Sequence, residues 1–167
     1  MSRGFYGQVN GSLFKAEYRG LDKKWRNQMY DRGYMLKVLG GKEWMLGKRK
    51  QNVFNVSVKY TLQGGLRHTP IDVAAMKANV AAGIIDDQPI YKEDQAMSLQ
   101  FSPTSILDLT VSYKINCKKV SHTFAFEGVN ILQHETPYAE RYDFGTGQLR
   151  IDKSSISLPN VFYRIDF

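Results

Sequence analysis

Apolar and polar residues alternate strictly along two stretches of the chain, residues 54–63 and 107–116. Successive side chains of a β-strand point to opposite faces, so this alternation predicts two strands, each with one apolar and one polar face. The apolar positions of the first stretch are Phe54, Val56, Val58, Tyr60 and Leu62, and those of the second are Leu107, Leu109, Val111, Tyr113 and Ile115. The intervening positions carry Asn, Ser, Lys, Thr, Asp and Gln side chains.

Weaker alternation marks further strands on both sides of these two stretches. We count six strands in total, roughly at 4–18, 29–45, 52–64, 97–116, 120–133 and 155–167. In the fifth strand the apolar positions change parity after Glu127 and Gly128, which predicts a β-bulge there. Several strands exceed the globular average of about 5–6 residues. They reach the roughly 9–11 residues that a tilted strand needs to cross a membrane.

The connections between these strands alternate between long and short. Three are long, at 19–28, 65–96 and 134–154, and two are short, at 46–51 and 117–119. Outer-membrane β-barrels have short periplasmic turns and long extracellular loops, so the alternation fits such a barrel with its C-terminus at the periplasm. The predicted fold is therefore all-β: an antiparallel up-and-down meander that forms part of a transmembrane β-barrel.

A short helix is predicted within the long connection at 65–96. Residues 73–82 are rich in alanine, Asp72 precedes them as a candidate N-cap, and Gly83 follows as a candidate C-cap. The helix would lie among the extracellular loops.

Six strands are too few to close a barrel, because bacterial outer-membrane barrels begin at eight strands. An open sheet in lipid would leave two rows of backbone groups unpaired in hydrocarbon, at several kcal/mol for each group. The first residues, 1–6, also lack the apolar segment of a secretory signal peptide. We therefore expect residues 1–167 to be a single C-terminal portion of a larger barrel.

The C-terminal residues and several internal stretches resemble a known family. The last strand ends in an aromatic residue preceded by alternate apolar positions, like the terminal assembly signal of outer-membrane barrels, and the matching residues are Val161, Tyr163, Ile165 and Phe167. The stretches 41–44, 60–65, 100–103, 111–116 and 158–160 are similar to the end of TonB-dependent receptors that begin with a carboxypeptidase-regulatory-like domain. This resemblance covers nearly the whole chain.

The resemblance implies the wall of a 22-stranded barrel in the cell outer membrane that takes up a nutrient. In that family an N-terminal plug fills the barrel and contacts the TonB complex, and neither the plug nor its contact box lies in these residues. The implied partners are outer-membrane lipid, the rest of the barrel with its plug, the TonB complex through that plug, and an extracellular ligand of unknown identity.

Composition and motif spacing argue against nucleic-acid binding, metal binding and enzyme activity. The formal net charge is +7, but the densest basic runs, at 47–50 and 117–119, fall in predicted tight turns and do not form the extended basic stripe expected for nucleic-acid binding. Cys117 is the single cysteine, and His68, His122 and His134 are more than ten residues apart. These residues give no disulfide framework or metal-ligand spacing. No cofactor motif or nucleophile elbow is present, so we expect no enzyme activity.

Aromatic and loop residues supply candidate contact sites. Trp44, Tyr113, Tyr163 and Phe167 are predicted near the periplasmic rim, and Tyr18, Tyr30, Tyr34, Tyr60 and Phe101 near the outer rim, as in the aromatic girdles of a barrel. Exposed Trp, Tyr and Arg side chains are typical of binding surfaces. The candidate ligand contacts in the outer loops are Trp25, Arg26, Arg67, His68, Tyr138 and Arg141.

Two other classes of protein fit the same pattern. A small soluble or cell-surface β-barrel or sandwich would enclose the apolar faces in a core and act as a binding module. A different outer-membrane barrel, porin-like or adhesin-like, would have the same wall. The polar strand faces would meet a plug or water equally well, so the residues alone do not separate the latter from a receptor.

Overall fold

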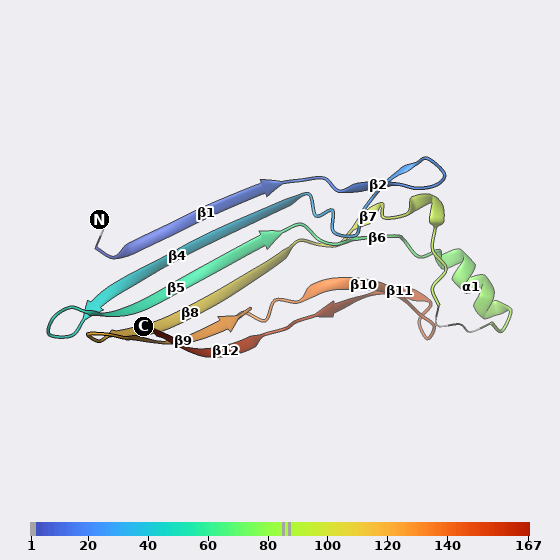
Figure 1. Ribbon diagram of the computed structural model, residues 1–167. Helices are drawn as coiled ribbons and strands as arrows, with labels where there is room; N and C mark the ends of the chain where they lie inside the picture. The colour runs from blue at the N-terminus through green and yellow to red at the C-terminus, as the bar shows by residue number, and fades with distance from the viewer. Residues whose placement is uncertain (1–2, 85, 87) are drawn as a thin grey trace.

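A computed structural model describes residues 3–84, 86 and 88–167. Its main element is one six-stranded antiparallel sheet in the order β1-β4-β5-β8-β9-β12 (Figure 1). Each strand of this sheet pairs with the next one along the chain among the six, as in a meander. The strands are β1 (Phe5–Leu13), β4 (Tyr34–Leu46), β5 (Asn52–Gln63), β8 (Thr104–Asn116), β9 (Ser121–Val129) and β12 (Leu158–Asp166).

The six predicted strands are all confirmed, although several are shorter than expected. The first ends at Leu13; the Phe14 backbone N–H still donates to the Gly33 carbonyl at 3.0 Å, and the chain then leaves the sheet. The predicted strand at 97–116 divides before Pro103, which has no N–H to donate to a sheet ladder. Its first part becomes the separate strand β7 (Leu99–Gln100), and β8 begins at Thr104.

The predicted bulge near Glu127 and Gly128 is wrong. The pairing of β9 with β12 runs without a register shift from residue 121 to residue 129. Val129 pairs with Leu158 on the face opposite Phe126, and the strand ends there, so Ile131 no longer belongs to the alternation. The next residue, Asn130, has a φ of 51°, and its backbone N–H donates to the Asp108 carboxylate at 2.9 Å.

The long connections carry the remaining elements at one end of the sheet (Figure 1). The first holds the hairpin of β2 (Glu17–Arg19) and β3 (Trp25–Asn27), and the last holds the hairpin of β10 (Thr136–Asp143) and β11 (Gln148–Ser154). The middle connection holds β6 (Arg67–His68), α1 (Val73–Ala81) and the 3-10 turn η1 (Glu93–Gln95), followed by β7, which pairs with β6. We call this the long-connection end, and the opposite end, with the turns 47–51 and 117–120, the short-turn end.

The predicted helix is confirmed at Val73–Ala81. The Asp72 carboxylate caps its N-terminus by accepting from the backbone N–H groups of Ala74 and Ala75, both at 3.0 Å. The C-cap is Ala82, and Gly83 follows it with a φ of 75°, a conformation that glycine adopts without steric cost. In the described residues no helix has the length and apolar character needed to cross a membrane.

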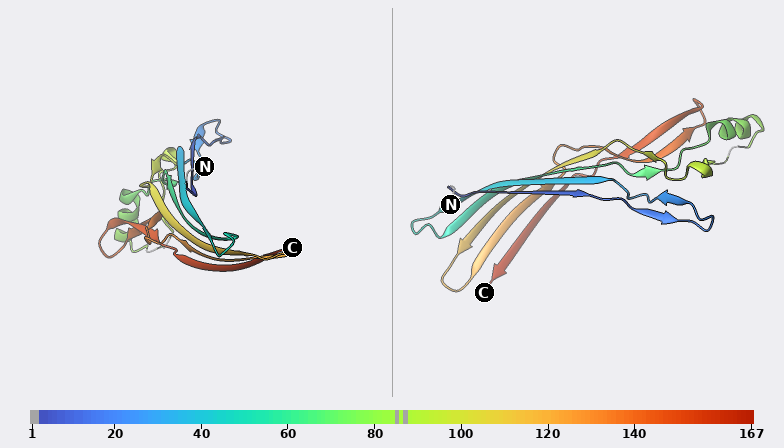
Figure 2. Two further views of the ribbon diagram at one scale, coloured as in Figure 1. Left: turned by 90° about the vertical axis from the view of Figure 1, so that its left-hand side faces the viewer. Right: turned by 90° about the horizontal axis from the view of Figure 1, so that it is seen from above.

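The sheet is a single bowed layer that does not close on itself, with β1 and β12 as its free edges (Figure 2). Within the described residues, a cluster of buried apolar side chains lies at the long-connection end and contains Ile71, Met76 and Tyr142. Val73, Ile90 and Phe144 pack against it. Among the described residues, neither the helix nor a second sheet packs on the six strands.

Candidate functional site

The two faces of the sheet differ sharply in chemistry. Strand register places the ten predicted lipid-facing residues of β5 and β8 on one side, with pairs such as Val56 and Val111 or Val58 and Leu109 directly opposite each other. None of the ten is buried in the chain. We call this side the apolar face. The other side carries polar pairs, including the Lys59–Asp108 ion pair at 2.8 Å, in which Asp108 is buried.

Five aromatic residues lie in register across five neighbouring strands of the apolar face. The pairing runs from Trp44 through Phe54, Tyr113 and Phe124 to Tyr163. Trp44 and Phe54 have ring centroids 5.6 Å apart, and Phe124 and Tyr163 have centroids 4.8 Å apart. This aromatic row lies two or three residues from the strand ends at the short-turn end. It contains three of the four residues predicted there.

The two tyrosines of the aromatic row direct their hydroxyl groups toward the short-turn end. The Tyr113 hydroxyl accepts from the Asn52 side-chain amide at 3.2 Å, and the Tyr163 hydroxyl shares a hydrogen bond with His122 Nδ1 at 2.7 Å. Asn52 and His122 stand at the short-turn ends of β5 and β9. The ring bodies therefore lie toward mid-strand and the polar tips toward the end, an orientation that suits a boundary between an apolar and a wet region.

The terminal strand contributes three of its four predicted signal residues to the apolar face. Val161, Tyr163 and Ile165 pair in register with Phe126, Phe124 and His122 of β9. Phe167 lies one residue beyond the end of β12 and is 99% exposed. The opposite edge of β12 pairs with no strand of the described chain.

The predicted outer aromatic rim is not one surface. Tyr34 and Tyr60 lie in the sheet, but Tyr18 belongs to the β2–β3 hairpin and Tyr30 to the loop after it. Phe101 is buried and stacks on the His68 ring with centroids 3.9 Å apart. It therefore packs inside the loops at the long-connection end.

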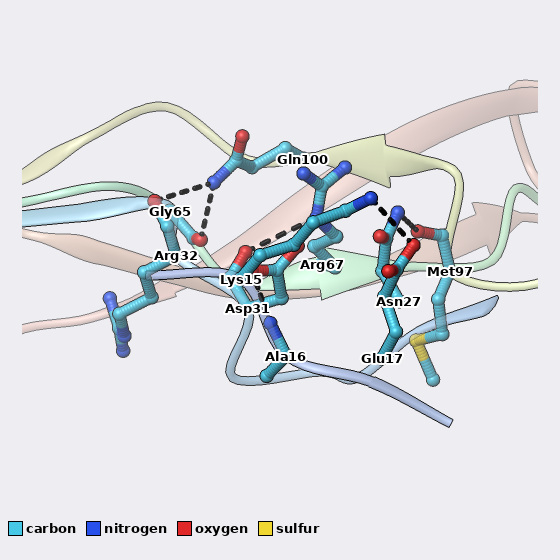
Figure 3. Close-up of polar contacts among 10 residues, drawn as sticks. All are labelled: Lys15, Ala16, Glu17, Asn27, Asp31, Arg32, Gly65, Arg67, Met97 and Gln100. Carbon is cyan, nitrogen blue, oxygen red and sulfur yellow. Dashed lines mark hydrogen bonds and ion pairs between the residues drawn. The ribbon is translucent and has the colours of Figure 1, made fainter. Parts of the chain in front are cut away.

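A buried ion pair joins two of the long connections (Figure 3). The Asp31 carboxylate, 1% exposed, accepts from Arg67 Nε at 3.0 Å and from the backbone N–H of Ala16 at 3.0 Å. The Arg67 backbone N–H donates to the Met29 carbonyl at 2.9 Å. The loop before β4 is thus held against β6 by one ion pair and by backbone hydrogen bonds.

Gln100, on β7, joins the same two connections through hydrogen bonds. Its side-chain amide donates to the carbonyl groups of Arg32 at 3.2 Å and Gly65 at 3.1 Å (Figure 3). A Cβ atom on Gly64 would lie 1.9 Å from the Arg32 carbonyl oxygen, so only glycine permits this close approach. We call Asp31, Arg67, Ala16, Arg32 and Gln100 the rim network.

The six predicted ligand-contact residues lie on three different connections, and the structure does not gather them into one site. Trp25 is exposed on β3, and Arg26 beside it forms a two-pronged ion pair with Asp22, which lowers the pKa of that carboxyl to about 2. Arg67 belongs to the rim network. Tyr138 and Arg141 lie on β10, where Arg141 pairs with Asp152 at 2.6 Å.

An open cavity of about 700 Å³ separates the α1 connection from the β10–β11 hairpin. Met76, Tyr91, Tyr142 and Phe144 give it apolar walls, and Glu140, Arg141, Asp143 and Arg150 supply charge. Arg141 is the one predicted contact residue that lines it. The cavity can admit a small polar molecule with an apolar side, since such sites combine apolar walls with a few oriented polar groups.

His68 links the middle connection to the β10–β11 hairpin. Its ring is held against Phe101, and Nε2 lies 4.0 Å from the Glu140 carboxylate. Burial lowers the pKa of His68, and this effect outweighs the nearby Glu140 charge, which raises the pKa. Glu140 also accepts from the backbone N–H of Ile71 at 3.2 Å.

We expect the β10–β11 hairpin to loosen as the pH falls below about 6.5, the ordinary pKa of histidine. The pKa of His68 is lower in the folded state, so the unfolded state binds more protons and the contribution of His68 to stability is complete only above that pH. Hydrogen exchange of the hairpin amides at pH 7.5 and 5.5 measures the effect. His68→Phe preserves the ring stacking and should reduce the pH dependence; an unchanged dependence in this variant would contradict the assignment.

The remaining candidate residues for metal or thiol chemistry lie apart in the described chain. No group of three or more His, Cys, Asp and Glu side chains lies close enough to hold a metal ion. Cys117 is exposed in the turn between β8 and β9. Sequence reasoning missed Asp31, Glu140 and Asp152, because the contacts that define them join segments far apart in the chain.

Comparisons with known proteins identify no relative of this chain. No protein-family model matches the chain, and neither the curated proteins nor the solved structures contain a significant match. The class of protein that the structure defines is therefore an all-β chain with an open antiparallel sheet and one short helix.

Proposed function

We propose that this chain is a wall segment of a transmembrane β-barrel in a bacterial outer membrane, in a TonB-dependent receptor for nutrient uptake. The observation that carries the proposal is the uncovered apolar face of the six-stranded sheet. Val9, Val161 and Phe124 on this face are 68%, 76% and 50% exposed. Soluble proteins rarely expose contiguous apolar surface on this scale, whereas a barrel wall turns such a face toward lipid.

Strand length and connection length support the membrane assignment. The six strands contain 9–13 residues each, close to the roughly 9–11 that a tilted strand needs to cross the hydrocarbon. The aromatic row lies near the strand ends on the side of the short turns, where a barrel has one of its interfacial girdles. The long connections would then stand outside the cell.

The free edges of β1 and β12 support a wall segment within a larger barrel. Unpaired backbone groups are costly in hydrocarbon, so both edges require neighbouring strands in a membrane. The polar face, with the Lys59–Asp108 pair, would face the barrel interior and meet water or a plug. The receptor class rests on the resemblance of the terminal strand and the internal stretches to TonB-dependent receptors.

Partitioning between buffer and detergent tests this function. We expect the purified chain to be insoluble in buffer, and a longer gene product that carries it to give β-type circular dichroism and heat-modifiable gel mobility in detergent. A folded, monomeric β-protein in buffer without detergent would overturn the membrane assignment and favour a soluble binding module. Uptake assays with the intact receptor then identify the nutrient.

A further inference from the structure

Positive charge is concentrated at the short-turn end of the sheet. The β4–β5 turn carries Lys48, Arg49 and Lys50, and the β8–β9 turn carries Lys118 and Lys119. Neither turn contains an acidic residue, and all five basic side chains are exposed. These five residues, which we call the basic turns, account for most of the formal net charge of +7.

The basic turns have no carboxylate partner, unlike four arginines of the long connections. Within the described residues none of the five forms an ion pair. At the long-connection end, by contrast, Arg26, Arg67, Arg141 and Arg150 all pair with aspartates at 3.1 Å or less. The basic turns are therefore free to meet an anionic partner outside the chain.

Lys42 adds a cation on the apolar face close to this end. It is the only charged residue that strand register places on that face in the described strands. Its ammonium group lies 4.4 Å from the Phe5 ring centroid and 5.0 Å from that of Trp44. A lysine on an apolar surface extends its ammonium group toward the polar boundary, so Lys42 marks a boundary near the aromatic row.

Only a few residues separate the aromatic row from the basic turns. Lys48 follows Trp44 by four residues, which spans at most roughly 13 Å along an extended strand. The Tyr113 and Tyr163 hydroxyls point the same way. Moving outward, the surface thus passes from apolar side chains to aromatic rings with polar tips and then to unpaired cations.

We propose that the basic turns and Lys42 bind the phosphate groups of anionic phospholipids in the leaflet beside the short-turn end. This inference rests on the proposed membrane function and assigns a ligand class to one end of the wall. Charge complementarity supplies the attraction, because Lys and Arg near an anionic lipid surface each contribute favourably to binding. An acidic protein or a nucleic acid would lack the adjacent hydrocarbon that the aromatic row requires.

The test uses the full chain reconstituted, within its barrel, in phosphatidylcholine bilayers with trace spin-labelled lipid. Electron paramagnetic resonance then compares motionally restricted phosphatidylglycerol with phosphatidylcholine. The test variant combines Lys48→Gln, Arg49→Gln, Lys50→Asn, Lys118→Gln and Lys119→Gln, with Asn chosen because Lys50 has a φ of 50°. The charge-matched control at the long-connection end combines Arg19→Gln, Lys23→Asn, Lys24→Gln, Lys77→Gln and Lys92→Gln.

We expect about a fivefold preference for phosphatidylglycerol in the unmodified protein and in the control, weakened by high salt and reduced in the test variant to the small share that Lys42 contributes. Circular dichroism verifies that both variants keep their β-structure. Restricted lipid without any preference for phosphatidylglycerol would overturn this inference and leave the membrane function intact. The absence of restricted lipid of either kind would overturn the membrane function itself.

Discussion

Val111→Arg is expected to destabilise the assembled barrel by about 2–4 kcal/mol, the cost of placing an arginine on lipid near the middle of a barrel strand. Val111 pairs in register with Val56 on one side and Phe126 on the other, so the new charge would stand among apolar side chains. The measurement is the urea dependence of folding in phospholipid bilayers, read from heat-modifiable gel mobility.

Ser112→Arg is the matched control for this charge. Ser112 lies next to Val111 but on the polar face, opposite Asn55 and Ala125. In the proposed wall, an arginine there would face the barrel interior, and its cost should be much smaller. Equal destabilisation by the two substitutions would mean that the faces do not differ in environment, which would contradict the proposed wall.

The sheet was predictable because its chemistry repeats every second residue. In β5 and β8 the alternation extends almost from end to end. β5 lies within one residue of its predicted limits, and β8 ends where predicted, at Asn116, although it begins at Thr104, well after the predicted start at 97. Strand register follows from the same pattern, since a slip of one residue would exchange the apolar and polar faces. The short turns then leave a meander as the simplest connection.

Strand ends were less predictable, because local chemistry outside the alternation decides them. Apolar residues continue past Val129, but the left-handed Asn130 and its bond to Asp108 end β9 there. Asp108 is 22 residues earlier and on another strand, so no pattern within the fifth strand predicts this contact. A bulge and a strand end produce the same change of parity in the sequence.

The candidate site was predictable in part for a similar reason. Trp44, Tyr113 and Tyr163 were expected near one rim because each stands close to a strand end. The row of five rings requires the register of four strand pairs, which adds Phe54 and Phe124. The loop residues do not alternate, and their contacts span 36 residues from Asp31 to Arg67, so exposure was predicted for residues that prove to be structural.

Asp31→Ala is expected to release the loop before β4 and to cost about 3 kcal/mol of stability at the long-connection end. The substitution leaves the Arg67 guanidinium, whose side chain is mostly buried, without its carboxylate, and removing one partner of a buried ion pair typically costs about 3–5 kcal/mol. It also deprives the Ala16 N–H of its acceptor. Hydrogen exchange should rise together in residues 14–33 and 64–68, because the ion pair holds these two segments against each other.

Asp22→Ala is the matched control within the same connection. Asp22 also pairs with an arginine, at 2.6 Å from Arg26, but this pair is local and its carboxylate side chain is 42% exposed, against 1% for Asp31. Exposed ion pairs contribute little, so only the β2–β3 hairpin should exchange faster. A double variant, Asp31→Ala with Arg67→Met, should recover part of the loss because no unpaired charge remains. Equal effects of Asp31→Ala and Asp22→Ala would show that burial does not set the strength of the rim network, and the ordering of the long connections would need another cause.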